Sequence, residues 1–253
     1  MRLSIAITIF VLLTSAVLAD EVASSGVKIA FTVQGSGSPV VLIHGFHGSA
    51  ATNWTLPGVT AALAQSHKVI AMDCRGHGSS DKPQTEAEYG TAMVEDVVAI
   101  LNRLDIRKAH IVGYSMGGMI ALKMAVTHPE RTQGLLLYGM GWLQDGSMLQ
   151  GFWEHIPVRE RLVGGSSGSA CMKGMAQLAV SEAEVKTLKM PAAIIVGDRD
   201  PVDRMYVAPL TQIRPDWPVT KISGAGHLNC IMKLEFREAV VNSVAKFDSR
   251  AQR

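Results

Sequence analysis

The sequence predicts an α/β fold with a mostly parallel central sheet, and two features of its hydrophobic pattern support this. Short, uninterrupted apolar runs recur along the chain, and each ends at a glycine or a polar residue. Such runs are typical of parallel strands that helices cover on both faces. Amphipathic helical segments lie between several of these runs, and this alternation indicates a parallel sheet with right-handed crossovers.

The first strands are expected to form an antiparallel hairpin. Residues 28–33 alternate between apolar and polar side chains, and the Gly-Ser-Gly-Ser-Pro cluster at 35–39 is typical of a turn. The remaining strands are predicted at residues 40–43, 69–72, 109–112, 135–138, 192–196 and 219–222. Ligands of open parallel sheets bind at the carboxyl ends of the strands, so the residues that follow these runs are candidates for a site.

Helices are predicted at residues 93–104, 116–126 and 233–247. The first places Val94, Val97 and Leu101 on one face, and the second is rich in Ala and Met until His128-Pro129 ends it. These segments supply the crossovers of the sheet.

One stretch interrupts the alternation of strands and helices. Residues 141–189 contain no strand-like run, but helical patches at 148–155 and 171–180 flank a flexible Gly- and Ser-rich loop at 164–169. We interpret this stretch as a small helical cap over the strand ends. The alternative is a set of ordinary crossover helices with a long surface loop.

The N-terminus accounts for much of the high mean hydropathy of +0.19. Residues 1–19 contain one positive charge, an apolar run from Leu3 to Leu13, and small or neutral residues at Val17 and Ala19. This pattern is typical of a cleaved signal peptide and predicts export to the periplasm or the extracellular space. An uncleaved signal anchor is the alternative. Without these residues the chain is about 45% apolar, an ordinary globular value with no stable membrane span expected.

The composition excludes some classes of partner. With 24 Lys and Arg against 22 Asp and Glu, the chain has no strongly basic balance and nucleic acid is not an expected partner. Three widely spaced cysteines form neither a disulfide framework nor a zinc-ligand cluster, so we expect them to be small buried apolar residues. No metal ion or organic cofactor is expected.

The segment Gly113-Tyr114-Ser115-Met116-Gly117 is the strongest chemical signal. It follows an apolar strand and begins an Ala-rich helix. In this context Ser115 is predicted to occupy a tight, strained turn that exposes its hydroxyl beside the amides at a helix N-terminus. The alternative is a plain glycine-rich turn.

A nucleophilic serine requires a base and a carboxylate that orients the base. His227 lies in a glycine-rich loop after the last predicted strand, and Asp200 follows the 192–196 strand with Asp198 as its turn-forming neighbour. We therefore predict a Ser115-His227-Asp200 triad. Of the other histidines, His110 is expected to be packed within a strand, and surface or turn positions are expected for His67, His77, His128 and His155.

The loop after the 40–43 strand is the candidate for the oxyanion hole. The backbone N–H of Phe46 is predicted to act with that of Met116, while His44 holds the loop through hydrogen bonds rather than serving as a second base. The loop 73–80 is interpreted as scaffold, with Arg75 in a local pair. Weaker candidates for contact with the substrate are His47, Trp54 and Trp142, together with Met140, Phe152 and Trp153 of a possible apolar pocket.

Together these motifs resemble the α/β-hydrolase superfamily over nearly all of residues 20–253. The resemblance depends on five motifs in family order: His44-Gly45-Phe46, Asp73-x-Arg75-Gly76-x-Gly78-x-Ser80, Gly113-Tyr114-Ser115-Met116-Gly117-Gly118, Gly197-Asp198-x-Asp200 and Gly226-His227. It implies an eight-stranded, mostly parallel sheet and a catalytic triad. A serine at the elbow is unlike the members with an aspartate nucleophile, and the elbow is similar to those of haloperoxidase-like esterases and C–C bond hydrolases.

The expected function is that of a secreted serine hydrolase that cleaves small carboxylic esters through an acyl-enzyme. Amidase, lactonase, C–C bond hydrolase and perhydrolase-like activities are alternatives within the same fold. A catalytically silent binding protein is the alternative from another functional class.

Overall fold

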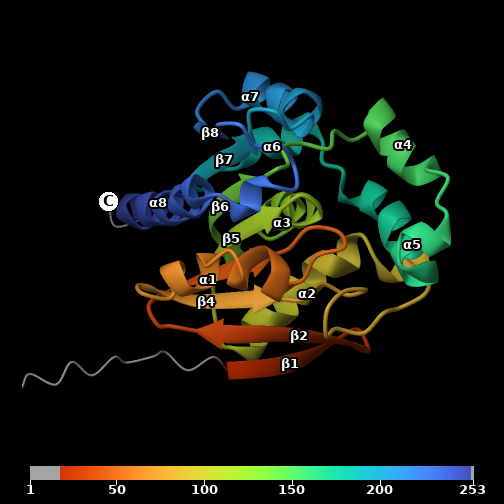
Figure 1. Cartoon of the computed structure of the whole chain (residues 1–253), viewed down its shortest axis with the longest axis horizontal. Coiled ribbons are helices and arrows are strands. Elements are labelled where there is room, and N and C mark those ends of the chain that lie inside the picture. Colours follow the sequence, from red (N-terminus) through yellow and green to blue (C-terminus); the bar gives the residue numbers. More distant parts are fainter. Residues whose placement is uncertain (1–17, 252–253) are drawn as a thin grey trace, which may run out of the picture.

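The computed structural model describes residues 18–251, and its centre is one eight-stranded sheet (Figure 1). The strand order is β1-β2-β4-β3-β5-β6-β7-β8, with β3 to β8 parallel and β1 and β2 antiparallel at one edge. This arrangement confirms the predicted fold class. The strands are β1 (Leu18–Ser24), β2 (Val27–Gln34), β3 (Ser38–Ile43), β4 (His67–Met72), β5 (Ala109–Tyr114), β6 (Thr132–Tyr138), β7 (Ala192–Gly197) and β8 (Val219–Ile222).

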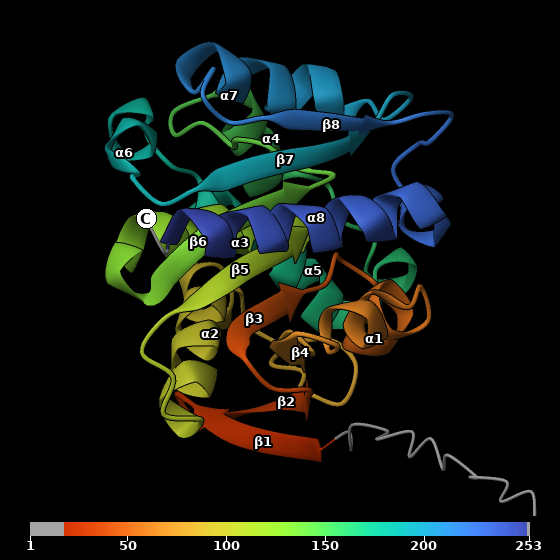
Figure 2. The same ribbon diagram turned by 90° about the vertical axis from the view of Figure 1, so that its left-hand side faces the viewer.

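Helices cover both faces of the sheet, which explains why its central strands are uninterrupted apolar runs. Every residue of β5 and β7 is buried. Along β3, Val41 and Ile43 pack into one hydrophobic cluster while Val40 and Leu42 pack into the other. Figure 2 shows α8 crossing in front of the sheet, with α2 and α3 behind it. The helices of the two layers are α1 (Val59–Leu63), α2 (Thr91–Arg103), α3 (Met116–Thr127), α7 (Ala208–Ile213) and α8 (Leu234–Ala251).

The predicted hairpin exists, but its turn differs from the predicted one. Ser25 and Gly26, with φ values of 49° and 81°, join β1 to β2, as a two-residue hairpin turn requires. The cluster at 35–39 instead leads from β2 into β3. A Cβ atom on Gly35 would lie 2.4 Å from the carbonyl oxygen of His67, so this position needs glycine for the close approach.

The start of β1 overlaps the predicted signal peptide. Leu18 and Ala19 pair with Val33 and Thr32 of β2, whereas residues 1–17 lie outside the described residues. Cleavage after Ala19 therefore stays a prediction. Within residues 18–251, no helix has both the length and the apolar character to cross a membrane.

The connection from β6 to β7 contains the helices of the predicted cap. Residues 148–155 form α4 (Met148–His155), as predicted, and α5 (Gly165–Gly174) and α6 (Glu182–Thr187) follow. Figure 1 shows α4 and α5 together at one side of the molecule, beyond the helices that cover the sheet. This position is consistent with a cap.

The prediction of a flexible loop at residues 164–169 is wrong, because α5 begins at Gly165. Its small residues permit close packing. Ser167 is buried with its hydroxyl 2.6 Å from that of Tyr89, and a Cβ atom on Gly174 would lie 2.6 Å from the Cβ of Tyr89. Tertiary contacts thus outweigh the low helix propensity of the Gly-Ser run.

Arg75 forms a buried ion pair with a distant residue rather than a local one. Its Nε and Nη2 donate to the two carboxylate oxygens of Asp96 in α2 at 2.7 and 2.5 Å, and its Nη1 donates to the carbonyl of Glu88 at 2.6 Å. Both side chains are almost completely buried. The pair fixes the loop after β4 to the helical layer.

Removing one partner of this pair is expected to destabilise the fold strongly. Asp96→Asn leaves the guanidinium of Arg75 buried without a counter-charge, at a cost of about 3–5 kcal/mol. Urea unfolding of the variant measures this loss. The double variant Arg75→Met with Asp96→Leu should recover a large part of it, and equal stability of D96N and wild type would contradict the assignment.

The structure corrects the placement of one histidine and confirms that of the cysteines. His67 is buried in β4 rather than at the surface, whereas His155 is exposed and His110 is packed within β5 as predicted. His77 lies in the turn after β4, as predicted, but its side chain is buried. His67 and His110 each place Nε2 2.9 Å from a carboxylate oxygen of Asp248. The cysteines are buried free thiols at positions 74, 171 and 230.

The burial of His77 predicts that the fold loses stability in acid. Burial, helped by the neighbouring His44, lowers the pKa of His77 from 6.5 to about 4. The unfolded chain therefore binds the proton more readily, so the stability present above pH 6.5 is lost as the pH falls toward 4. The full effect is roughly 3 kcal/mol. Urea midpoints at pH 7.5 and 4.5 should differ less in His77→Gln than in wild type, and an equal difference would contradict this prediction.

Candidate active site

Ser115 lies at the turn between β5 and α3, in a backbone conformation that few residues other than glycine adopt. Its φ is +52° and its ψ is −116°. The flanking glycines make this turn possible, because a Cβ atom on Gly113 would lie 2.0 Å from the carbonyl oxygen of Gly117. A Cβ atom on Gly117 would lie 2.2 Å from that of Ile43. Steric crowding thus explains the Gly-x-Ser-x-Gly spacing and places the hydroxyl above the sheet.

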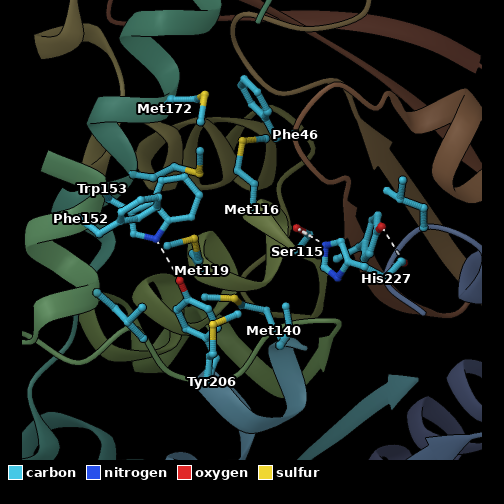
Figure 3. Close-up of a pocket in the computed structure, with 16 residues that line it drawn as sticks. Phe46, Ser115, Met116, Met119, Met140, Phe152, Trp153, Met172, Tyr206 and His227 are labelled. Carbon is cyan, nitrogen blue, oxygen red and sulfur yellow. Dashed lines mark hydrogen bonds between the residues drawn. The ribbon is translucent and has the colours of Figure 1, made fainter. Parts of the chain in front are cut away.

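The three predicted triad residues are joined by hydrogen bonds. Nε2 of His227 lies 2.9 Å from Oγ of Ser115 (Figure 3), and Nδ1 lies 2.8 Å from Oδ2 of Asp200. These residues come from the loops after β5, β7 and β8, which meet because parallel strands end at the same edge of the sheet. This chain of hydrogen bonds allows a proton to move from the serine to the imidazole, and the carboxylate stabilises the resulting imidazolium cation.

The two candidate aspartates have different environments. Asp200 is buried, and its second carboxylate oxygen accepts a hydrogen bond from the N–H of Val202 at 2.9 Å. Asp198 is exposed and accepts a hydrogen bond from the N–H of Ala225 at 3.2 Å. Backbone hydrogen bonds from Gly224 and Ala225 lower the pKa of Asp198. Asp200 therefore orients the imidazole, and Asp198 holds the turn that carries His227.

His227 is also held by a residue that the sequence reasoning did not assign. The hydroxyl of Tyr114 donates to the carbonyl oxygen of His227 at 3.0 Å, and its ring stacks on that of Tyr138. Burial raises the pKa of Tyr114, so this hydroxyl stays protonated as a donor. In the sequence, only the position of Tyr114 directly before Ser115 indicated that Tyr114 could contribute to the site.

His44 supports the loop after β3, as predicted. Its Nδ1 donates to the carbonyl of Gly45 at 2.7 Å, and its Nε2 accepts from the N–H of Cys74 at 2.9 Å. Burial lowers the pKa of His44, which keeps the ring neutral. Because both ring nitrogens are engaged, His44 is a structural group and not a second base. Asn53 also fixes the loop by accepting from the N–H of Gly45 at 2.9 Å.

Phe46 and Met116 lie at the positions expected of oxyanion donors. Both residues line the cavity around Ser115, and Met116 is the first residue of α3. Within residues 18–251, neither backbone N–H has a hydrogen-bond acceptor in the protein. Two free amides next to the nucleophile are suited to stabilise a developing negative charge.

The cavity above Ser115 has a volume of about 570 Å³ and an almost entirely apolar lining. Tyr206 and Trp153 supply polar atoms away from the triad, and the indole Nε1 donates to the tyrosine hydroxyl at 3.1 Å (Figure 3). The lining consists of Phe46, Tyr114, Ser115, Met116, Met119, Met140, Leu149, Phe152, Trp153, Met172, Met175, Val202, Met205, Tyr206, His227 and Leu228.

None of the three weaker substrate-contact candidates lines the cavity; the predictions for Trp54 and Trp142 are wrong because both side chains are buried elsewhere, and the one for His47 stays a prediction. Trp54 packs near Phe236 in the hydrophobic cluster that α8 covers. Trp142 is buried and donates to the carbonyl of Val180 at 2.7 Å. His47 is exposed and packs against the ring of Phe46.

Besides the predicted triad and oxyanion residues, sequence reasoning identified three of the pocket residues, Met140, Phe152 and Trp153, but missed the other nine. The missed methionines lie on α3, on α5 and the short helix Met175–Leu178 that follows it, and on the segment after β7. A methionine on a helix gives the same sequence signal whether it packs in the core or lines a cavity. Within the described part of the chain, no three His, Cys, Asp or Glu side chains form a cluster suited to hold a metal ion.

A family model described as the alpha/beta hydrolase fold matches residues 38–156. The acetyltransferase component of the acetoin cleaving system of Pseudomonas putida is 42% identical over 119 residues, 46% of this chain and 31% of that protein. The 2-hydroxymuconate semialdehyde hydrolase of Pseudomonas sp. strain CF600 is 40% identical over 123 residues, 47% of this chain and 42% of that protein. Both matches thus span less than half of the relative's length.

A solved structure extends the similarity to the whole fold. The 2-hydroxy-6-oxo-6-phenylhexa-2,4-dienoate hydrolase of Rhodococcus sp. strain RHA1 is 22% identical, with a TM-score of 0.71. The alignment covers 93% of this chain and all of that one. Together with the strand order of the sheet, this similarity shows that the described chain has the α/β-hydrolase fold, and residues 38–156 match the family model of that fold.

Proposed function

We propose that the protein is a serine hydrolase that cleaves carboxylic esters through an acyl-enzyme. The observation that supports this proposal is the hydrogen-bonded order Ser115-His227-Asp200 at an apolar cavity. In the first step Nε2 of His227 takes the proton of Ser115 while Oγ attacks the acyl carbon. The amides of Phe46 and Met116 stabilise the oxyanion, each contributing up to about 10²–10³ in rate.

The second half of the reaction uses the same groups. The protonated His227 donates its proton to the departing alcohol, and the acyl group stays on Ser115. His227 then removes a proton from water as the water attacks the acyl carbon, and it returns this proton to Oγ of Ser115 as the bond to the acyl carbon breaks and the acid is released. Asp200 keeps the imidazole in the tautomer that both steps need.

Cleavage of a C–C bond is the second candidate, because the segment around Ser115 resembles those of C–C bond hydrolases, and two of the similar proteins are named as hydrolases of a semialdehyde and of a dienoate. The Rhodococcus protein is named for a dienoate, which is a carboxylate. A buried carboxylate needs a cationic or hydrogen-bonding partner. No Lys or Arg lines the cavity among the described residues, and this favours an uncharged ester.

Labelling with a fluorophosphonate tests the proposed chemistry. The reagent should form one adduct with the purified protein, located on Ser115 by peptide mass spectrometry, and hydrolysis of activated esters should stop as the adduct forms. A folded protein that forms no adduct and hydrolyses no ester would instead support the silent binding protein. An adduct with activity only toward a C–C substrate would support the second candidate.

We also propose that the protein is exported through a cleaved signal peptide. The composition of residues 1–19 supports this proposal. Intact mass measurement of the protein from the native host should give a chain that begins at Asp20. An intact Met1 would contradict cleavage, and a membrane-bound intact chain would support the signal anchor.

A further inference from the structure

We propose that the cavity is an acyl-chain pocket and that the natural substrates are esters of medium-length, unbranched and uncharged acyl chains. The inference rests on the proposed ester hydrolysis and names its substrate class. It further assigns the pair Trp153–Tyr206 as the end wall that sets the length of the acyl chain.

The first argument is the absence of polar recognition in the cavity. Within the described residues, its lining includes no Lys, Arg, Asp or Glu. The hydroxyl of Tyr114 is engaged with His227, and that of Tyr206 with Trp153. A charged acyl terminus would therefore lose its hydration without gaining an ionic partner, which excludes it energetically.

The second argument is the type of apolar side chain. Six methionines line the cavity, at positions 116, 119, 140, 172, 175 and 205. Methionine is unbranched and has three rotatable bonds, so its side chain adapts to irregular or flexible partners. A methionine-rich wall therefore suits a flexible acyl chain with many conformers. A rigid acyl ring would instead be recognised by a wall of one fixed shape.

The third argument is the direction that the reaction imposes on the substrate. Since His227 must protonate the leaving oxygen, the alcohol part lies on the side of His227. Leu228 next to it is 79% exposed and also lines the cavity, so the cavity opens there. Figure 3 shows Trp153 and Tyr206 across the cavity from Ser115 and His227, which leaves that side for the acyl chain.

The final argument is the hydrogen bond at that side of the cavity. Trp153 belongs to α4 of the cap, whereas Tyr206 belongs to the short helix Asp203–Val207 that follows the Asp200 loop. The contact of 3.1 Å joins these two segments. Tyr206 is buried and Trp153 is partly buried. The two joined rings therefore form a wall on that side of the cavity, between the exposed lining residues Phe152 and Met205, and a longer acyl chain would have to displace this wall or extend past it into solvent.

The experiment compares p-nitrophenyl esters from acetate to palmitate in the wild type and in Trp153→Ala. For the wild type, kcat/KM should rise at least about tenfold from acetate to a medium-chain optimum and fall for longer chains. Trp153→Ala removes the end wall and should shift the optimum to longer chains. Met148→Ala, on the same helix but 94% exposed and outside the cavity, is the matched control and should keep the wild-type profile.

A second substrate pair tests the charge argument without any variant. A half-ester whose acyl chain ends in a carboxylate should react at least about tenfold more slowly than the neutral ester of equal length. Tyr206→Phe keeps the ring but breaks the hydrogen bond, so it should broaden the optimum even if Trp153→Ala fails to fold.

The outcomes separate this inference from the proposed function. A protein that hydrolyses esters with a maximum at acetate, with a preference for aromatic acyl groups, or with equal rates for charged and neutral chains would overturn the acyl-chain pocket. So would a folded Trp153→Ala with an unchanged profile. Absence of both ester hydrolysis and a fluorophosphonate adduct would instead overturn the proposed function.

Discussion

Replacing Ser115 with alanine is expected to lower kcat for ester hydrolysis about 10⁶-fold, which leaves a rate close to background. The variant removes the attacking oxygen, whereas the binding cavity and the amides of Phe46 and Met116 stay in place. Because the triad acts as one unit, adding His227→Ala to Ser115→Ala should cost little more. Initial rates on a medium-chain p-nitrophenyl ester measure both effects.

The control for this variant is a serine elsewhere on the same edge of the sheet. Ser79 lies exposed in the turn after β4, and Ser79→Ala should retain wild-type activity. Thermal unfolding should show that Ser115→Ala stays folded. Retention of more than a trace of hydrolysis in the folded variant, after removal of contaminating esterases, would show that Ser115 is not the nucleophile.

Asp200→Asn is expected to lower kcat about 10⁴-fold while the fold and the substrate affinity persist. The asparagine amide would donate toward Nδ1 of His227, which favours the tautomer with its proton on Nε2. That tautomer cannot accept the proton of Ser115. The drop should therefore appear in the acylation rate measured by stopped-flow with an activated ester.

Asp198→Asn is the matched control, since it makes the same chemical change two residues earlier. Its carboxylate is exposed and accepts hydrogen bonds from backbone amides and from the Ser223 side chain of the His227 loop, so activity should change by a few-fold at most. The opposite ranking, with Asp198→Asn the slower enzyme, would show that the structure has assigned the wrong carboxylate.

The hydrophobic pattern of the sequence predicted the parallel strands well because their physical requirement is local. A strand covered on both faces must be apolar at every position, and residues 109–112 and 192–196 satisfy this directly. The antiparallel strand β1 carries no such requirement. Its residues also overlap the apolar N-terminal segment, so the hairpin turn at Ser25-Gly26 was missed.

The triad was predictable for a related reason. Ser115, Asp200 and His227 each follow a strand run directly, and the ends of parallel strands meet at one edge, so their order along the chain implied their proximity. The structure then gave what sequence spacing could not. It showed the hydrogen bonds of His227 to Ser115 at 2.9 Å and to Asp200 at 2.8 Å, and the burial that distinguishes Asp200 from the exposed Asp198.

Other features depend on contacts between distant segments. The Gly-Ser run 165–169 is helical because Tyr89 packs against it. The ion-pair partner of Arg75 is Asp96, which lies on α2 and not in the same loop. The predicted contacts of Trp54 and Trp142 with the substrate were wrong because an aromatic residue near a strand end can face the core as readily as the site.

The sequence by itself determined the fold class, the strand–turn–helix context of the nucleophile and the identity of the three triad residues. Each of these depends on local backbone geometry and on hydrophobic periodicity. Only the tertiary structure decided the lining of the cavity, since it is assembled from the β3 loop, α3, the cap and the loops after β7 and β8. Whether a side chain points into the cavity depends on the packing of all these elements, so no local sequence pattern indicates it.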